Sequence, residues 1–287
     1  MDYLNLIRAY QWIKNVLIFV PMLAIHEFSK DILILNIYAF IAFSLVSSSV
    51  YILNDISDIK SDRLHPRKKL RPIPAGKISI TKGKIISILF LLIGLIISYK
   101  INTNLLILIV LYFTLSNLYS LIFKQKIILD ITILSLLYTM RIIAGGLILN
   151  VMPSVWILAF SIFFFFSLAS IKRQAELIDI IKRKKIFTKG RGYSSTDLPI
   201  LTISALSSGY VSVLIMAFYV NSGAIIKLYA EPIALWGICI ILLYWITRLV
   251  MLTNRGMMKD DPIIFAIKDF GSLICLVAIF FLILFAI

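Results

Sequence analysis

Apolar stretches alternate with short polar segments along the whole chain, and each stretch is about 20 residues long, the length at which an α-helix crosses a bilayer core of roughly 30 Å. Helices are expected because every backbone hydrogen bond is then satisfied within the segment. The pattern therefore predicts an all-α integral membrane protein. We expect about nine transmembrane helices, at residues 13–30, 32–53, 84–100, 104–123, 127–149, 153–171, 198–221, 232–251 and 265–287.

Composition agrees with this prediction. Only 15% of the 287 residues are charged and 61% are hydrophobic, whereas a soluble domain has about 25% charged residues. We expect residues 1–287 to form a single polytopic domain. Its segments 54–83 and 172–197 are expected to lie on the cytoplasmic side and to cap the active site.

The positive charge predicts the orientation. With the N-terminus in the cytoplasm, all but four of the 29 lysines and arginines fall in or beside cytoplasmic segments, as the positive-inside rule requires. We therefore expect a multi-pass protein of the cell (inner or plasma) membrane in contact with anionic lipid. Because topology explains the net charge of +15, nucleic acid is not an expected partner. A homo-oligomer is left open.

An acidic cluster follows the second apolar stretch. Asn54, Asp55, Asp58 and Asp62 are spaced by three or four residues, and residues at this spacing share one face of a helix. Carboxylates so close together need a cation, and oxygen ligands suit Mg²⁺, which also binds substrate phosphates. The spacing predicts these four residues as Mg²⁺ ligands. The alternative is a solvated helix end.

Basic residues follow the acidic cluster at once, in a segment that three prolines keep from forming a helix. A stiff basic loop beside a metal-carboxylate cluster is expected to cover a diphosphate, with lysine and arginine taking up the remaining charge. The alternative is a loop that contacts only lipid headgroups. The residues predicted to bind substrate here are Arg63, Arg67, Lys68 and Arg71.

Charges at two more places predict anion binding. Arg141 lies inside an apolar stretch, where a cation is costly unless it faces a cavity or a partner; we assign it to a phosphate, with a structural ion pair as the alternative. Lys14, at the edge of the first stretch, either reaches a headgroup or phosphate or extends to the membrane surface. In "KRQAEL" (172–177), Lys172 and Glu176 share a helix face. They point either to a second anionic group or to an ordinary ion pair.

The acidic cluster and the loop after it resemble the first aspartate-rich motif of the UbiA superfamily of intramembrane prenyltransferases. The matching pattern is Asn-Asp-x-x-Asp-x-x-x-Asp (54–62) followed by Arg-Pro-x-x-x-Gly (71–76). This resemblance implies a UbiA-like fold with a central cavity open to the cytoplasm. In that cavity the motif binds Mg²⁺ and diphosphate.

Where a typical member of the superfamily has a second aspartate-rich motif, this chain has "KRQAEL". That sequence is similar to one branch of the superfamily, the decaprenyl-phosphate phosphoribosyltransferases. Three further segments resemble the same branch: "RAYQWIKN" (8–15), "MRIIAGG" (140–146) and "DPIIFAIKD" (261–269). Arg191 and Tyr193 are matched to a further motif of the branch with a shifted spacing.

The resemblance implies transfer of 5-phosphoribose from 5-phosphoribosyl 1-diphosphate to a polyprenyl phosphate, a step in making cell-envelope precursors. The implied catalytic residues are Asp55, Asp58, Asp62, Arg141 and Lys172. The implied substrate-binding residues are Lys14, Asn54, Arg63, Arg67, Lys68, Arg71, Arg173, Glu176, Arg191 and Tyr193. One alternative is prenyl transfer from a prenyl diphosphate to an aromatic or glycerol-phosphate acceptor. A second is a transporter, which would need charged residues spread along a path through the helices.

Overall fold

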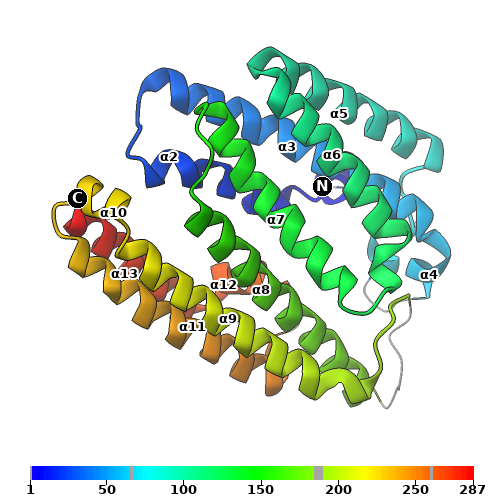
Figure 1. Ribbon diagram of the computed structural model, residues 1–287. Helices are drawn as coiled ribbons and strands as arrows, with labels where there is room; N and C mark the ends of the chain where they lie inside the picture. Colours follow the sequence, from blue (N-terminus) through cyan, green and yellow to red (C-terminus); the bar gives the residue numbers. More distant parts are fainter. Residues whose placement is uncertain (1, 65–67, 184–189, 259–260) are drawn as a thin grey trace. The chain divides into compact units, whose positions relative to one another are not determined.

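The computed structural model describes residues 2–64, 68–183, 190–258 and 261–287. Its long elements are all α-helices (Figure 1). The chain forms two compact units, Met1–Leu121 with Met140–Met152, and Ile122–Thr139 with Pro153–Ile287. Helix α7 (Leu129–Ile148) contributes its first half to the second unit and its second half to the first.

Unit 1 is built around three long helices, α3, α5 and α6, which pack side by side (Figure 1). A short helix and a 3-10 helix precede α3, and a compact turn region joins α3 to α5. In chain order the elements are α1 (Asp2–Ile7), η1 (Ala9–Phe19), α2 (Val20–Ala24), α3 (Lys30–Ser57), α4 (Ile59–Arg63), η2 (Lys68–Leu70), α5 (Ile80–Ile101) and α6 (Thr103–Leu121).

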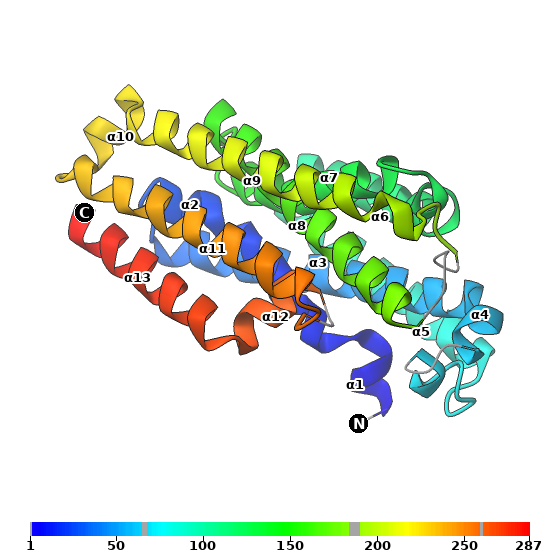
Figure 2. The same cartoon turned by 90° about the horizontal axis from the view of Figure 1, so that it is seen from below.

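Unit 2 is built around α8, α9, α11 and α13, each of which packs against the next (Figure 2). Ser154 caps the start of α8 by accepting a hydrogen bond from the Ile157 N–H at 3.2 Å. The elements besides α7 are η3 (Phe123–Gln125), α8 (Val155–Lys182), η4 (Ser195–Asp197), α9 (Leu198–Val220), α10 (Gly223–Leu228), η5 (Pro232–Leu235), α11 (Trp236–Asn254), α12 (Pro262–Lys268) and α13 (Phe270–Ala286).

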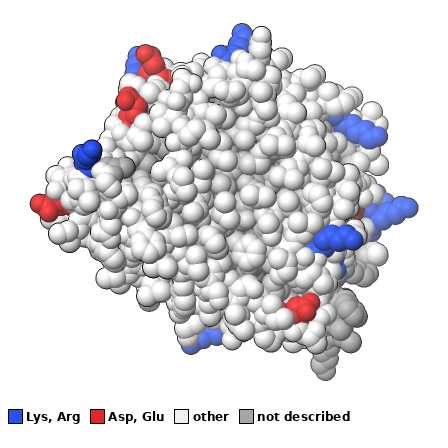
Figure 3. Space-filling view, in the orientation of Figure 1, with Lys and Arg blue, Asp and Glu red and all other residues white. Residues whose placement is uncertain are grey.

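The all-α membrane class is confirmed. Among the described residues, seven helices are long and apolar enough to cross a membrane, or eight if α12 and α13 count as one bent span. In the view of Figure 3 most visible atoms belong to uncharged residues, as lipid-facing helices require. The expected number of nine helices is not confirmed, and the central cavity, its cytoplasmic opening and the capping segments stay predictions.

The first expected span, 13–30, is not one continuous α-helix. Residues Ala9–Phe19 form a 3-10 helix and Val20–Ala24 a short α-helix. Pro21 lacks the N–H that would continue the hydrogen-bond ladder. A side chain at Gly145 of α7 would lie 2.0 Å from the Ile18 carbonyl oxygen, so glycine allows this irregular segment to pack directly on α7.

The last expected span, 265–287, is broken at Asp269, where α12 and α13 meet at 86°. Asp269 caps α13 by accepting hydrogen bonds from the Ser272 N–H at 2.8 Å and its hydroxyl at 2.7 Å. Its two carboxylate oxygens also take a paired contact from Arg248, at 2.5 and 3.0 Å. The side chain thus starts a new helix instead of continuing the old one.

Helices α3 and α8 both extend beyond the expected ends at residues 53 and 171. Each has 28 residues, a length of about 42 Å that exceeds a bilayer core of about 30 Å. The extra turns carry Asn54 and Asp55 on α3, and Lys172, Arg173 and Glu176 on α8. The start of the first charged motif and the "KRQAEL" motif therefore lie on the ends of long helices.

Candidate functional site

In unit 1, Arg71 joins two buried aspartates. Its guanidinium contacts Asp55 Oδ1 at 3.0 Å and Asp62 Oδ2 at 2.7 Å. Both carboxylates are almost fully buried, with side-chain exposures of 1% and 2%. Lys68, on the exposed side, lies 3.8 Å from Asp62. We call Asp55, Asp62, Arg8, Arg71 and Lys68 the aspartate cluster.

Arg8 approaches Asp55 from a different part of the chain. Its guanidinium donates to Asp55 Oδ1 and lies over the Tyr51 ring at 4.9 Å from the centroid. The Arg8 backbone has φ 51°, in the left-handed region that non-glycine residues seldom adopt. The Ser48 hydroxyl donates to the neighbouring Ile7 carbonyl at 2.8 Å, which ties this turn to α3. A strained backbone held by tertiary contacts is typical of functional positions.

The residues present fit a divalent cation only in part. Asp55 Oδ2 is buried and has no hydrogen-bond partner in the described part of the chain, and such an oxygen is a natural ligand for Mg²⁺. Within the described residues, however, no three acidic, histidine or cysteine side chains lie close enough together to hold a metal on their own. Asp55 and Asp62 would supply protein oxygens, and phosphate oxygens of a substrate would complete the coordination.

The other predicted residues of the first motif and its loop have different surroundings from Asp55 and Asp62. Asp58 occupies the break between α3 and α4, so the expected continuous acidic face is interrupted there. Asn54 and Asp58 are both half-buried. Arg63 turns away from the cluster and donates to the Pro74 carbonyl at 3.1 Å, which supports the proline turn. Arg67 lies outside the described residues.

Arg141 is buried among aromatic and amide groups of unit 1. It donates to Asn15 Oδ1 at 2.7 Å and to the Tyr112 hydroxyl at 2.9 Å. Its guanidinium also lies over the rings of Phe43 and Tyr112, at 5.5 and 5.0 Å from the centroids. These contacts satisfy a cation at membrane depth and fix η1 to α7. Lys14, which neighbours Asn15 on η1, is also buried, with 7% exposure.

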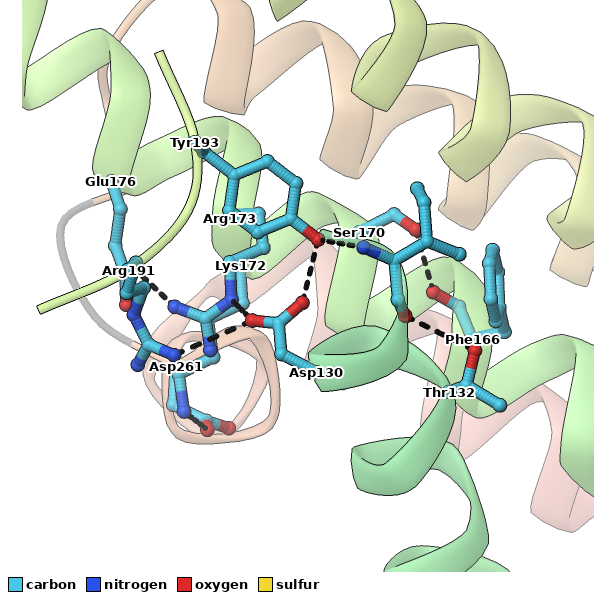
Figure 4. Close-up of polar contacts among 11 residues, drawn as sticks. Asp130, Thr132, Phe166, Ser170, Lys172, Arg173, Glu176, Arg191, Tyr193 and Asp261 are labelled. Atoms are coloured by element: carbon cyan, nitrogen blue, oxygen red, sulfur yellow. Dashed lines mark hydrogen bonds and ion pairs between the residues drawn. The ribbon is translucent and has the colours of Figure 1, made fainter. Parts of the chain in front are cut away.

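In unit 2, Asp130 at the start of α7 organises a second buried network (Figure 4). It is fully buried and contacts Arg173 Nε at 2.8 Å and Arg191 at 3.4 Å. The Tyr193 hydroxyl donates to its other oxygen at 2.6 Å. Glu176 completes the network through Arg173 and through Arg191 Nε at 3.0 Å. We call these five residues the Asp130 network.

The network attaches the segment after residue 190 to the helices. Tyr193 is 1% exposed, and its hydroxyl accepts the Ile128 N–H at 2.8 Å while donating to Asp130. Burial and the adjacent carboxylate raise the pKa of Tyr193, so the phenol stays a neutral donor. Arg173 is likewise 1% exposed. Both residues therefore hold the local structure in place rather than presenting a free surface.

Lys172 on α8 contacts an acidic residue outside this network. Its ammonium group contacts Asp261 Oδ2 at 3.1 Å and is 30% exposed. Asp261 in turn accepts the Ile263 N–H at 3.2 Å and so caps α12. Lys172 thus lies beside the N-terminal end of α12, where Asp261 begins the "DPIIFAIKD" segment, and it keeps some access to solvent.

Removing the Tyr193 hydroxyl should destabilise unit 2. Tyr193→Phe leaves the Ile128 N–H and one Asp130 oxygen without their buried partner, so we expect a loss of about 1–3 kcal/mol in unfolding free energy. Thermal unfolding in detergent measures it. The control is Tyr210→Phe, whose hydroxyl shares an exposed hydrogen bond of 3.0 Å with Thr247 and should cost no more than about 0.5 kcal/mol. Equal effects of the two changes would contradict the structural role of Tyr193.

The sequence interpretation missed the two contacts that connect distant parts of the chain. Arg8 was grouped with the N-terminal signature, but not with Asp55. Asp130 was given no role in the sequence analysis. A buried acid at the start of an apolar stretch was the available signal, because such a group needs a cation from elsewhere in the chain.

Comparison with known proteins defines the class. The model of the UbiA prenyltransferase family matches residues 16–267. The chain belongs to this family, which confirms the resemblance seen in the aspartate motif. With its apolar helices, it is an integral membrane protein of a transferase family.

Two curated relatives indicate where in the family the chain lies. Nodulation protein NoeC of Azorhizobium caulinodans is 33% identical over 97% of this chain and 91% of its own length. Decaprenyl-phosphate phosphoribosyltransferase of Mycolicibacterium smegmatis is 35% identical over 60% of this chain. The chain spans about half the length of some curated relatives, 55% of this enzyme and 52% of a protein from Sinorhizobium fredii.

Solved structures agree on the fold. A UbiA homolog from Archaeoglobus fulgidus, bound to GPP and Mg²⁺, matches with a TM-score of 0.73 and 17% identity, covering 99% of both chains. At this identity the match establishes the shared architecture alone. The UbiA-like fold expected from the sequence is confirmed.

Proposed function

We propose that this protein transfers 5-phosphoribose from 5-phosphoribosyl 1-diphosphate to a polyprenyl phosphate. An oxygen of the lipid phosphate forms a bond to C1 of the ribose as the bond from C1 to the diphosphate breaks. Diphosphate and polyprenyl-phosphoryl 5-phosphoribose are the products. The lipid phosphate is already an anion near neutral pH, so no protein nucleophile is required.

The aspartate cluster carries this proposal. Two buried carboxylates lie among three cations of the same chain, and one carboxylate oxygen has no hydrogen-bond partner among the described residues. Mg²⁺ held by Asp55 and Asp62, with Asn54 and Asp58 beside them, would offset the charge that develops on the leaving diphosphate. Arg71 and Lys68, with Arg63 and Arg67 in the same segment, would take the phosphate oxygens that the metal leaves.

The second motif favours phosphoribosyl over prenyl transfer. The reaction gathers a diphosphate, a 5-phosphate and a lipid phosphate, so it needs more cations than a prenyl diphosphate alone. Lys172, which is 30% exposed, supplies a cation in this motif, and the same "KRQAEL" pattern led to the phosphoribosyltransferase branch. The 35% identity to the mycobacterial enzyme over 60% of the chain supports the assignment.

The remaining assignments follow from their surroundings. Lys172, partly exposed, would contact a phosphate directly. Arg173, Glu176, Arg191 and Tyr193 would act by fixing the end of α8. Arg141 and Lys14 are assigned to a substrate phosphate. The active site and N-terminus are placed on the cytoplasmic side of the cell membrane, where the positive residues gather, and the product would feed cell-envelope synthesis.

Prenyl transfer is the second candidate. The family whose model matches the chain is one of prenyltransferases, and the A. fulgidus homolog with the same fold binds GPP and Mg²⁺. A prenyl diphosphate would use the aspartate cluster in the same way. The transporter alternative is set aside, because the family is one of transferases.

One assay separates the two reactions. Purified protein receives Mg²⁺, a polyprenyl phosphate and 5-phosphoribosyl 1-diphosphate labelled in the ribose. We expect label to move into the lipid fraction, and to do so only when all three are present. A parallel reaction with labelled geranyl diphosphate and glycerol phosphate or an aromatic acid tests prenyl transfer. Label that stays water-soluble in the first reaction, with product in the second, would replace our proposal by prenyl transfer.

A further inference from the structure

An aspartate stands at each end of the short helix α12, and each of the two has both a helix to cap and a cation to contact. Asp261 caps the start of α12 by accepting a backbone N–H at 3.2 Å, and it contacts Lys172 of α8 at 3.1 Å (Figure 4). Asp269 caps α13 by accepting a backbone N–H at 2.8 Å, and it contacts Arg248 of α11. Helix α12 is therefore tied to α8 at one end and to α11 at the other.

The Asp261 carboxylate is held by contacts of both its oxygens. One oxygen accepts the Ile263 N–H and the other faces Lys172. The side chain is 6% exposed, and Pro262, which is buried beside it at the start of the helix, has a backbone angle φ fixed by its ring. Helix α12 also packs against α8. A carboxylate with so little freedom fixes the place of the cation that it contacts.

Lys172, in contrast, has a flexible side chain that is 30% exposed. Its ammonium group carries three N–H donors, so contact with Asp261 is compatible with a further contact to a phosphate oxygen. Glu176, one turn further along α8, contacts Arg173 and Arg191. The acid that faces the Lys172 ammonium group at 3.1 Å thus comes from α12, a separate part of the chain.

We propose that Asp261 is a positioning residue for group transfer. It holds the Lys172 ammonium group in one place, so that the lysine meets a substrate phosphate in the geometry that the transition state requires. A charge fixed in advance needs no reorganisation during the reaction, and misplacing such a group slows catalysis even when the substrate still binds. This inference rests on the proposed function, in that Lys172 is taken to contact a substrate phosphate.

Asp261→Asn tests this role, because asparagine caps a helix as well as aspartate does and only the charge facing Lys172 is lost. Initial rates are measured on the purified full-length protein over a range of 5-phosphoribosyl 1-diphosphate concentrations. We expect kcat to fall about tenfold or more while KM changes less than about threefold, since the contact is needed chiefly in the transition state. Asp261→Ser, with another good capping residue, repeats the test in case the first variant folds poorly. An unchanged kcat in both variants would overturn the inference.

The matched control is Asp269→Asn, the same substitution at the other end of α12. It also keeps a helix cap and removes a carboxylate from a cation, here Arg248, which is assigned no contact with substrate. We expect a lower thermal midpoint but a kcat within about twofold of the wild type. Equal losses of kcat in Asp269→Asn and Asp261→Asn would mean that the packing of α12 matters, and not the position of Lys172.

A double-mutant cycle shows whether Asp261 acts through the lysine. Lys172→Met removes the ammonium group, so adding Asp261→Asn to it should lower the remaining kcat by no more than about twofold. The same fold loss with and without Lys172 would overturn the inference. If the wild type moves the prenyl label and not the ribose label, the cycle is run with geranyl diphosphate. Absence of phosphoribosyl transfer then rejects only the proposed substrate.

Discussion

Asp55→Asn should lower the rate of group transfer by about 100-fold or more, the size of effect seen when one element of charge stabilisation is removed from an active site. The change keeps the shape of the side chain but removes the negative charge on a buried group with an orphan oxygen. Arg8 and Arg71 would keep only Asp62 as a full counter-charge between them. The variant should therefore bind Mg²⁺ less tightly, and it should hold Arg8 and Arg71 in position less firmly.

The measurement is the rate of label entering lipid, taken as a function of Mg²⁺ concentration. We expect the residual activity of Asp55→Asn to need more Mg²⁺ for half-saturation. The control is Asp31→Asn, the same change in the first turn of the same helix, where the side chain is exposed. It should retain the wild-type rate. A folded Asp55→Asn protein with unchanged rate and unchanged Mg²⁺ dependence would refute the site.

Local spacing predicted that the aspartates of the first motif lie close together, and their roles in a site stay predictions. Asp55 lies in the last turn of α3 and Asp62 on α4, and both are buried and contact Arg71. Arg71 was expected to bind a diphosphate beside the acids, and in the structure it contacts the acids themselves. The break between α3 and α4 at Asp58 was not predicted, because the spacing alone was compatible with one continuous helix.

Local sequence patterns could not predict the contacts between residues that lie far apart in the sequence. Arg8 and Asp55 are 47 residues apart, and Tyr193 and Asp130 are 63 apart. Such pairs form because a buried charge must be compensated, but the sequence does not say which of 29 cations does so. Tertiary packing decides the choice.

The irregular first segment was missed for a related reason. Residues 13–30 are apolar enough to read as a span, so hydropathy outweighed the two polar residues Lys14 and Asn15. In the structure Asn15 accepts from Arg141 and donates to the Ser44 hydroxyl at 2.9 Å. These polar contacts, with Pro21 and Gly145, favour a 3-10 segment packed on α7 over a regular helix.

Breaking the Asp130 network should have the largest effect on stability. Asp130→Asn leaves Arg173, which is 1% exposed, with Glu176 as its remaining acidic contact in the network. Removing one partner from a buried ion pair costs about 3–5 kcal/mol, because the other charge stays buried without full compensation. Tyr193 would also lose a charged acceptor, so the segment after residue 190 should loosen as well.

Thermal and denaturant unfolding in detergent measure this loss, and limited proteolysis of the segment after residue 190 reports the local effect. The control is Asp179→Asn, also an acid facing an arginine of unit 2. Asp179 contacts Arg183 at 2.9 Å, but the side chains are 51% and 35% exposed, so the expected cost is at most about 1 kcal/mol. Similar losses in both variants would mean that the network does not hold this end of α8.

A double change then separates charge burial from packing. Arg173→Met in the Asp130→Asn background removes the uncompensated charge while keeping a long apolar side chain, and replacing both partners of a buried pair is often close to neutral. We therefore expect the double variant to recover part of the stability that Asp130→Asn loses. It should recover no transfer activity if the network is what fixes Lys172 and the end of α8. Recovery of both together would show that Arg173 is needed only to neutralise Asp130.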